Sequence, residues 1–395
     1  MMNYPRLLLS TTRKRLVAPI QEGLSSSTRS RVRSSRQVLR PPCCLSRSLS
    51  SSSDGSSTSV AFDRTIKQRQ RDNAARAQQL WKQADDDIND TDRVSYDYFR
   101  EEIARRLVDR LDDIRREEGF PLTLDVGSGP GYIYRAICAD DALEGEGGIG
   151  GVRKLVQLDS SQEMLHRDAE EEFEGMDRCG TYRMHAEEEG KLPFPDGTFD
   201  LVISSCALHW VNNLPGLFKE AHRVLKPDGC FMFAMVGGET LPELRVAMVM
   251  AELEREGGVS PHVGPFVELS DIGSLMQRAK FALPTIDIDT VHVSYPDAFV
   301  LMEHLQRMGE NNASIKKRER TAQDTFLATA CIYDELYAMQ PQDGDPDLGN
   351  KEVEASVQVI FAIGWTPDAS QQQPKARGSA THKIGEVVVD KTDGQ

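Results

Sequence analysis

Residues 122–131 have the sequence Leu-Thr-Leu-Asp-Val-Gly-Ser-Gly-Pro-Gly, and this stretch decides the fold. The apolar residues of 122–126 predict a short strand, and a helix is expected from Tyr132. Between them, the glycines at 127, 129 and 131 allow a tight turn and a close approach of the backbone to a ligand. A strand, a glycine loop and a helix in this order indicate a parallel βα unit whose loop holds a cofactor.

The rest of the chain continues this alternation of strands and helices. The fourth strand is a nearly unbroken apolar run, as expected of a strand buried on both faces. The fold class is therefore α/β, a mostly parallel, doubly wound sheet with helical additions. Strands are expected at 122–126, 154–159, 181–186, 199–204, 230–236, 286–293 and 353–365. Helices are expected at 62–82, 93–118, from 132, at 214–225, from a capping box at 240–243 to 256, and at 270–280, 296–308 and 322–339.

Acidic residues surround the predicted loop and select the cofactor. Asp159 ends the second strand, where a carboxylate accepts hydrogen bonds from ribose hydroxyls. Glu187 follows the third strand, in reach of an adenine amino group. A dinucleotide loop has the pattern G-x-G-x-x-G, whereas this one is D-x-G-x-G-x-G, and Asp125 repels phosphate but suits an ammonium group. The pattern predicts S-adenosylmethionine, held by Asp125, Gly127, Gly129, Gly131, Asp159 and Glu187.

Charge divides the chain into an N-terminal leader and an acidic body. Residues 1–53 hold ten Lys or Arg and one acid, a net charge of +9, and since the whole chain carries -15, residues 54–395 carry -24. The Arg- and Ser-rich leader is typical of a mitochondrial transit peptide, with cleavage expected near 49/50. So acidic a body disfavours nucleic-acid binding. No apolar run is long enough for a transmembrane helix.

These observations divide the chain into four parts. The transit peptide of 1–53 is followed by a helical segment at 54–118. The cofactor-binding domain covers 119–367, with 140–151 as a flexible surface insertion, and 368–395 form a tail. The scattered cysteines lack the CxxC spacing of a zinc site. His185 and Glu187 have the spacing of an iron site, but Glu187 is already assigned to adenine, so no metal is expected.

Residues 120–235 resemble the type 11 methyltransferase family. The resemblance rests on the LDVGSGPGY motif, the acid at 159, Glu187 before LPFPDGTFDLV, the segment SSCALHWVNNLP, and LKPDG. It implies the class I methyltransferase, Rossmann-like version of the fold. It also implies that His209 and Trp210 lie over the cofactor; packing under the sheet edge is the alternative for both residues.

A second resemblance covers nearly the whole body. It rests on segments at 62–64, 237–241, 254–258, 260–262, 308–310 and 363–365, and is to a branch of this family that assembles mitochondrial complex I. That branch is described as protein arginine hydroxylases. The resemblance implies an iron–sulfur subunit of complex I as protein partner and a place on the matrix side of the inner membrane, where peripheral membrane association stays open. The chain departs from the branch in its insertion at 140–151 and in Glu187, where the branch has Asp.

The catalytic residues stay unknown at this point. Segments after strands four and five are expected to face the substrate, so the candidates are Glu239, Glu254, Glu256 and His262. Carboxylates pair well with a guanidinium, although the helix glutamates could equally form a solvated face. Three functions remain open: an arginine hydroxylase for complex I assembly, a matrix methyltransferase acting on a small molecule or protein, and a noncatalytic assembly chaperone.

Overall fold

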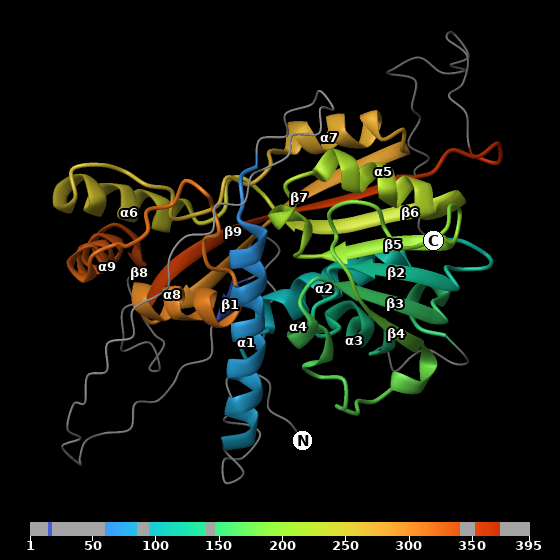
Figure 1. The fold of residues 1–395 in the computed structure, drawn as a ribbon, viewed down its shortest axis with the longest axis horizontal. Coiled ribbons are helices and arrows are strands. Elements are labelled where there is room, and N and C mark those ends of the chain that lie inside the picture. The colour runs from blue at the N-terminus through green and yellow to red at the C-terminus, as the bar shows by residue number, and fades with distance from the viewer. Residues whose placement is uncertain (1–14, 18–59, 85–94, 140–146, 340–351, 372–395) are drawn as a thin grey trace, which may run out of the picture.

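The computed structural model describes residues 15–17, 60–84, 95–139, 147–339 and 352–371. Their nine strands form one sheet in the order β1-β7-β9-β6-β5-β2-β3-β4, with β8 paired to β9 (Figure 1). Strands β4, β3, β2, β5 and β6 are mutually parallel, and β9 is antiparallel to β6 and β7. The predicted mostly parallel, doubly wound sheet is confirmed.

The strand positions follow the apolar runs of the sequence. Strand β5 is buried at every residue, as expected at the centre of a parallel sheet. The strands are β1 (Arg15–Val17), β2 (Leu122–Val126), β3 (Lys154–Asp159), β4 (Gly180–His185), β5 (Phe199–Ser205), β6 (Leu225–Val236), β7 (Ala282–Tyr295), β8 (Ala338–Met339) and β9 (Glu352–Trp365).

Helices cover both faces of the sheet. On one face, α2 (Tyr98–Asp112) and α3 (Tyr132–Cys138) pack against β3, β5 and β6. On the other, α5 (Leu214–Val224) and α7 (Leu269–Arg278) pack in a second core. The short helix α4 (Gln162–His166) follows β3. Each core buries mainly aliphatic and aromatic side chains, which supplies the main driving force for this arrangement.

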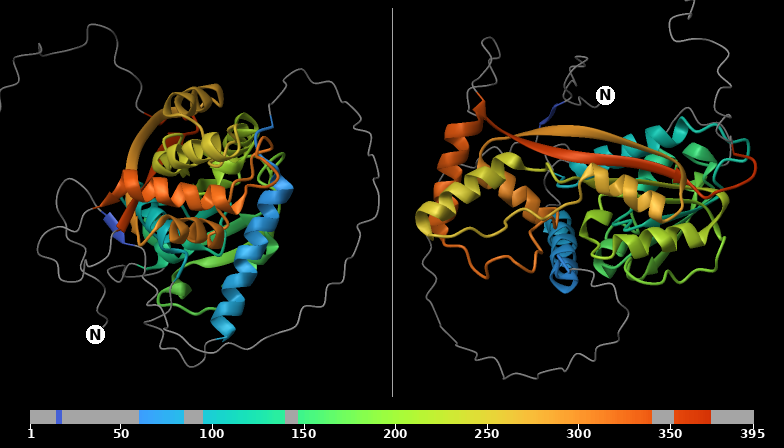
Figure 2. Two further views of the ribbon diagram at one scale, coloured as in Figure 1. Left: turned by 90° about the vertical axis from the view of Figure 1, so that its left-hand side faces the viewer. Right: turned by 90° about the horizontal axis from the view of Figure 1, so that it is seen from above.

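The helical additions lie beyond one end of the sheet. Helices α6 (Pro242–Arg255), α8 (Ala298–Arg307) and α9 (Gln323–Tyr337) gather around the far ends of β7 and β9 (Figures 1 and 2). The long helix α1 (Arg64–Ala84) stands between this helical group and the carboxyl ends of the parallel strands, where it packs on α4 and α8 (Figure 1). Helix α1 therefore contacts both the end of β3, through Asp159 and Ser160, and the helical additions.

Three local expectations were wrong. The capping box does not form: α6 begins at Pro242, while Thr240 and Glu243 bind β9 through Gln358 and Ser356 instead. Helix α2 ends at Asp112 rather than 118. The insertion is partly ordered, because Gly148 bridges Val152 and 149–151 form a 3-10 turn; residues 140–146 lie outside the described residues.

The termini are only partly described. Strand β1 lies inside the predicted leader, which was expected to contribute no fold, and pairs in parallel with β7. The rest of 1–53, including the expected cleavage near 49/50, lies outside the described residues. In the predicted tail, Gln371 binds Asp228, and 372–395 lie outside. No helix in the described ranges has the length and apolar character needed to cross a membrane.

Candidate functional site

The glycine loop between β2 and α3 forms a tight cradle. Gly127, Gly129 and Gly131 have φ of 73°, 57° and 104°, a region that L side chains rarely adopt. A Cβ added to Gly127 would lie 2.2 Å from the Cβ of Ala207, and one added to Gly131 would lie 2.7 Å from Nε2 of Gln157. Only glycine fits at these two positions, as expected of a loop that approaches a ligand closely.

Asp125 and Gln157 leave buried polar atoms without partners beside this loop. They are paired across β2 and β3, and both are at most 1% exposed. Neither carboxylate oxygen of Asp125, nor the amide nitrogen or oxygen of Gln157, has a hydrogen-bond partner. Burial, with the charge of Asp159, raises the pKa of Asp125 well above its ordinary value. A bound ammonium group would satisfy such a carboxylate.

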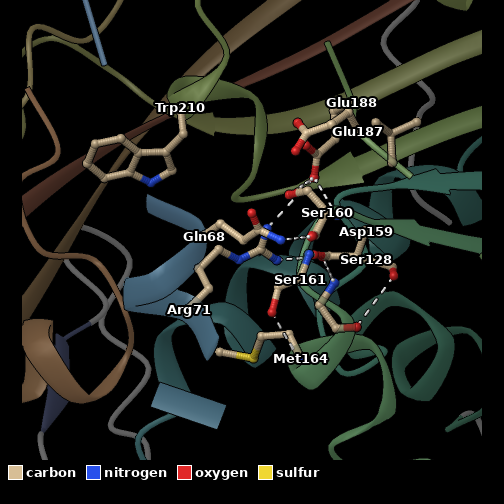
Figure 3. A network of polar contacts seen from close by, with 12 residues as sticks. Gln68, Arg71, Ser128, Asp159, Ser160, Ser161, Met164, Glu187, Glu188 and Trp210 are labelled. Carbon is tan, nitrogen blue, oxygen red and sulfur yellow. Dashed lines mark hydrogen bonds and ion pairs between the residues drawn. The ribbon is translucent and has the colours of Figure 1, made fainter. Parts of the chain in front are cut away.

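Asp159 at the end of β3 is saturated by three donors. Its Oδ2 accepts from the backbone N–H of Gly129 at 2.7 Å and from Arg71 of α1 at 2.5 Å, and its Oδ1 accepts from the N–H of Ser161 at 2.7 Å (Figure 3). Since the side chain is fully buried, these bonds fix the carboxylate at the carboxyl end of the sheet. Arg71 thus takes a position that a ribose hydroxyl would need.

The second acid next to the loop is Glu188 rather than Glu187. The side chain of Glu187 is 53% exposed and contacts Arg64 at 3.1 Å, whereas Glu188 is 3% exposed. Glu188 accepts from the N–H and hydroxyl of Ser160 and lies near Arg71 (Figure 3). It also pairs with Arg64. Burial favours the neutral acid, but the two arginines lower the pKa of Glu188 below its ordinary value.

The side chains of α1 fill the space beside Asp159 and Glu188. A space of about 10 Å³ remains, lined among others by Arg64, Lys67, Gln68 and Arg71 of α1. We call it the nucleoside pocket. It is far smaller than a nucleoside, so the residues fit such a ligand in chemistry, but α1 has to yield to admit it.

A much larger cavity of about 390 Å³ lies beside this pocket. Most of its walls are apolar. They come from α2, the helical additions, the loop before α7 and the ends of β6, β7 and β9, for example Phe99, Leu244, Phe266 and Leu301. Four residues line both the cavity and the nucleoside pocket: Arg100, Cys206, Trp210 and Glu310. A ligand in the cavity would therefore lie next to a cofactor in the pocket.

Glu310 is the centre of that shared wall. One carboxylate oxygen binds Arg100; the other accepts from Nε1 of Trp210 at 2.7 Å and lies 3.4 Å from Nζ of Lys67 and 3.5 Å from Nε2 of His209. Burial would raise the pKa of Glu310, but the charges of Lys67 and Arg100 lower it well below its ordinary range. Burial lowers the pKa of Lys67 to about 7, against the charge of Glu310.

The chain is similar in sequence to one protein family and to several named proteins. The family described as "Methyltransferase domain" matches residues 124–233. The mitochondrial arginine-hydroxylase NDUFAF5 of Rattus norvegicus is 41% identical over 327 residues, 83% of each chain. The chain belongs to the NDUFAF5 arginine-hydroxylase family. The member from Dictyostelium discoideum is 37% identical, covering 82% of this chain and 70% of that one. A malonyl-[acyl-carrier protein] O-methyltransferase of Laribacter hongkongensis is 29% identical, and the match covers 70% of this chain and 88% of that protein.

Of the two residues expected over the cofactor, only Trp210 belongs to the shared wall. Trp210 lines both spaces, and Lys67 lies over its ring, with Nζ 3.3 Å from the ring centroid. His209 lines the cavity alone, and its Nδ1 has no partner. Cys206 adopts a left-handed φ of 51° here, and burial raises the pKa of its thiol to about 12, so it is no ready nucleophile.

Of the four substrate-side candidates, the structure brings only His262 to the cavity. Glu239 and Glu254 are exposed, and Glu256 pairs with Arg318 and Thr325, which ties the end of α6 to α9. His262 lies 2.9 Å from Glu252, a fully buried acid that the sequence did not single out. The sequence analysis does not single out Glu310 either, although residue 310 lies in the segment 308–310 that carries the resemblance to the branch.

The iron-like spacing of His185 and Glu187 does not produce a shared site. Nε2 of His185 lies 3.0 Å from the carbonyl oxygen of Ser160, whereas Glu187 contacts Arg64. Within the described residues, no group of three or more His, Cys, Asp or Glu side chains could hold a metal ion.

Proposed function

We propose that this chain is a mitochondrial protein arginine hydroxylase that binds S-adenosylmethionine and acts on an iron–sulfur subunit during complex I assembly. The observation that carries the proposal is the 41% identity to a relative named arginine-hydroxylase over 83% of both chains. The site adds support, because Thr240, Leu241, His262, Met308 and Glu310 come from the branch-typical segments and line the cavity beside the nucleoside pocket.

The loop and the strand ends fit S-adenosylmethionine. We assign the methionine ammonium to Asp125, the ribose hydroxyls to Asp159 and the adenine amino group to Glu188, in place of the Glu187 expected from the sequence. When bound, this cofactor supplies a sulfonium-linked methyl group. Gly127, Gly129 and Gly131 leave the room that it needs beside Ala207 and Gln157.

Methyl transfer is the second candidate. The similarity to a malonyl-[acyl-carrier protein] O-methyltransferase favours it, as does the D-x-G-x-G-x-G loop. A methyltransferase needs little beyond alignment of a nucleophile with the sulfonium carbon, and the cavity adjoins the nucleoside pocket. The two reactions would use the same pocket and cavity but differ in co-reactant. Hydroxylation inserts one oxygen atom of O₂ into a bond of the arginine and takes two electrons and two protons from a reductant, which releases water. Methyl transfer consumes the methyl group of the bound cofactor.

Calorimetry tests the cofactor assignment. The purified protein should bind S-adenosylmethionine, and Gly127→Val should abolish binding because any side chain at 127 collides with Ala207. Mass spectrometry of complex I iron–sulfur subunits, from cells with and without the protein, tests the reaction. A gain of one oxygen on an arginine supports the proposal; a gain of one methylene group supports methyl transfer.

We place the protein in the mitochondrial matrix, on the matrix side of the inner membrane. The relatives are named mitochondrial, and the leader carries a net +9 charge. N-terminal sequencing of protein isolated from mitochondria should begin near residue 50, and retention of Met1 would contradict removal of a transit peptide.

A further inference from the structure

An open groove runs between α1 and α8. Gln70, Asn73 and Ala77 of α1 form one wall, and Met302 and Gln306 of α8 belong to the other. Oε1 of Gln70 is buried without a partner, although its Nε2 donates to the carbonyl of Asn312. An unpartnered acceptor in a groove is a position where a ligand N–H gains a hydrogen bond.

The groove adjoins the apolar cavity. Met302, Gln306, Asn311 and Phe326 line both. The cavity in turn shares Arg100, Cys206, Trp210 and Glu310 with the nucleoside pocket. The three spaces therefore lie in sequence, from the surface groove through the cavity to the pocket.

The chemistry changes along this path. In the groove, the carboxamides of Gln70, Asn73, Gln306 and Asn311 offer donors and acceptors of the kind that pair with a peptide backbone. The cavity walls are apolar and suit an aliphatic stem.

His209 lines the cavity at the inner end of this path. With its Nε2–H directed to Glu310, the unpartnered Nδ1 is an acceptor, and burial lowers the pKa of His209, which keeps the ring neutral. This nitrogen could accept from a guanidinium N–H.

We propose that the groove receives an extended segment of the protein substrate and that one arginine side chain passes through the cavity to place its guanidinium at His209. The inference rests on the proposed arginine chemistry and adds the route and the contact. The acidic body, net -24 over 54–395, favours a cationic segment. His209 is assigned to the substrate rather than to the cofactor.

The test uses the purified full-length protein with saturating S-adenosylmethionine. The probe is the capped peptide acetyl-Ala-Ala-Ala-Arg-Ala-Ala-Ala-amide, with a second peptide that has lysine in the central position. The arginine peptide should bind, and the lysine peptide should bind several-fold more weakly, since an ammonium group lacks the planar donors of a guanidinium. Equal affinity for both peptides, or no binding of either, would overturn the proposal.

Two pairs of variants locate the route. Ala77→Trp fills the groove and should weaken peptide binding by roughly tenfold or more, whereas Leu80→Trp, at a 66% exposed position of the same helix, should not.

The second pair of variants tests the contact at His209. His209→Gln keeps a donor for Glu310 and loses the Nδ1 acceptor, so it should weaken peptide binding. His209→Asn keeps an acceptor near the position of Nδ1 and should retain more of the peptide affinity. Unchanged affinity in Ala77→Trp and His209→Gln would show that the peptide binds elsewhere.

The same variants separate this proposal from the proposed function. In cells, Ala77→Trp should lose the oxygen increment on arginine while the purified variant still binds the cofactor. If wild type itself leaves the arginine unmodified, the hydroxylase function fails, and the peptide measurements still decide the route. If Ala77→Trp modifies arginine as wild type does, the function stands and the route is wrong.

Discussion

The guanidinium of Arg71 and the ribose hydroxyls of a bound nucleoside would compete for the carboxylate of Asp159. Asp159 already accepts from Gly129, Ser161 and Arg71, and the space of about 10 Å³ that Arg71 lines is far smaller than a nucleoside. Since a nucleoside has to displace the guanidinium, Arg71→Ala should bind S-adenosylmethionine more tightly than wild type. A hydrogen bond to a charged group contributes about 1.5–3 kcal/mol, so the gain should reach roughly tenfold in calorimetry.

The matched control is Arg76→Ala on the same helix. Arg76 forms an exposed pair with Glu163 and is 56% exposed, so its loss should leave cofactor affinity unchanged. Weaker binding in a folded Arg71→Ala variant would mean that Arg71 contacts the cofactor instead of competing with it.

Lys67 should make binding of the arginine peptide depend on pH. Burial lowers the pKa of Lys67 to about 7, and its charge interacts with Glu310, Arg100, Arg71 and His209. Below this pKa the protonated Lys67 repels an incoming guanidinium, and above it that charge is lost. Peptide affinity should therefore rise from about pH 6 to about pH 8, and Lys67→Met should flatten the rise. If peptide affinity rises with pH as steeply in Lys67→Met as in wild type, another titrating group causes the pH dependence.

At this scale, sequence reasoning found the loop and Asp159 because they lie in one short pattern. It missed Glu310 because the partners of Glu310, Lys67 and Arg100, lie more than 200 residues earlier in the chain. It also chose Glu187 over its neighbour, and only the fold shows that Glu188 is the buried one of the two.

At the scale of elements, the strands were the most predictable part. Strands β2 and β3 match the expected ranges, since central parallel strands are bounded apolar runs. The capping box failed because Thr240 and Glu243 found partners on β9, a strand more than 100 residues away. Local patterns predict an element well, but they do not predict which distant element takes its polar side chains.

A buried ion-pair network joins four helices. Arg167, just after α4, binds Gln78 of α1 at 2.8 Å, Asp97 at the start of α2 at 2.6 Å and its neighbour Asp168 at 2.5 Å. Tyr132 of α3 donates to Asp97 at 2.5 Å. Because Arg167 is only 1% exposed, Arg167→Met should lower the free energy of unfolding by about 3–5 kcal/mol, measured in urea.

Arg105→Met provides the comparison for this network. Arg105 is 52% exposed and pairs with Glu102 and Asp109 on its own helix, so its loss should cost about 0.5 kcal/mol or less. Equal losses in the two variants would contradict a structural role for the network.

At the scale of the whole molecule, charge divides the sequence into a basic leader, predicted to be a transit peptide, and an acidic body. Residues 1–53 carry a net charge of +9, and residues 54–395 carry -24. An acidic body is repelled by nucleic acid and attracts a basic peptide, which agrees with an arginine-bearing protein substrate. The sequence predicted this division from composition alone, whereas the groove, cavity and pocket depend on how α1 and α8 pack and could not be predicted from it.

The central claim is that the protein places an oxygen atom on an arginine of a complex I iron–sulfur subunit. The direct measurement is peptide mass spectrometry of these subunits from deletion cells that express either the protein or no protein, grown under isotopically heavy O₂. The account predicts one added oxygen on arginine, carrying the heavy isotope, only in cells with the protein. A methylene increment, or unmodified arginine with complex I assembly rescued even by Asp125→Ala, would contradict it.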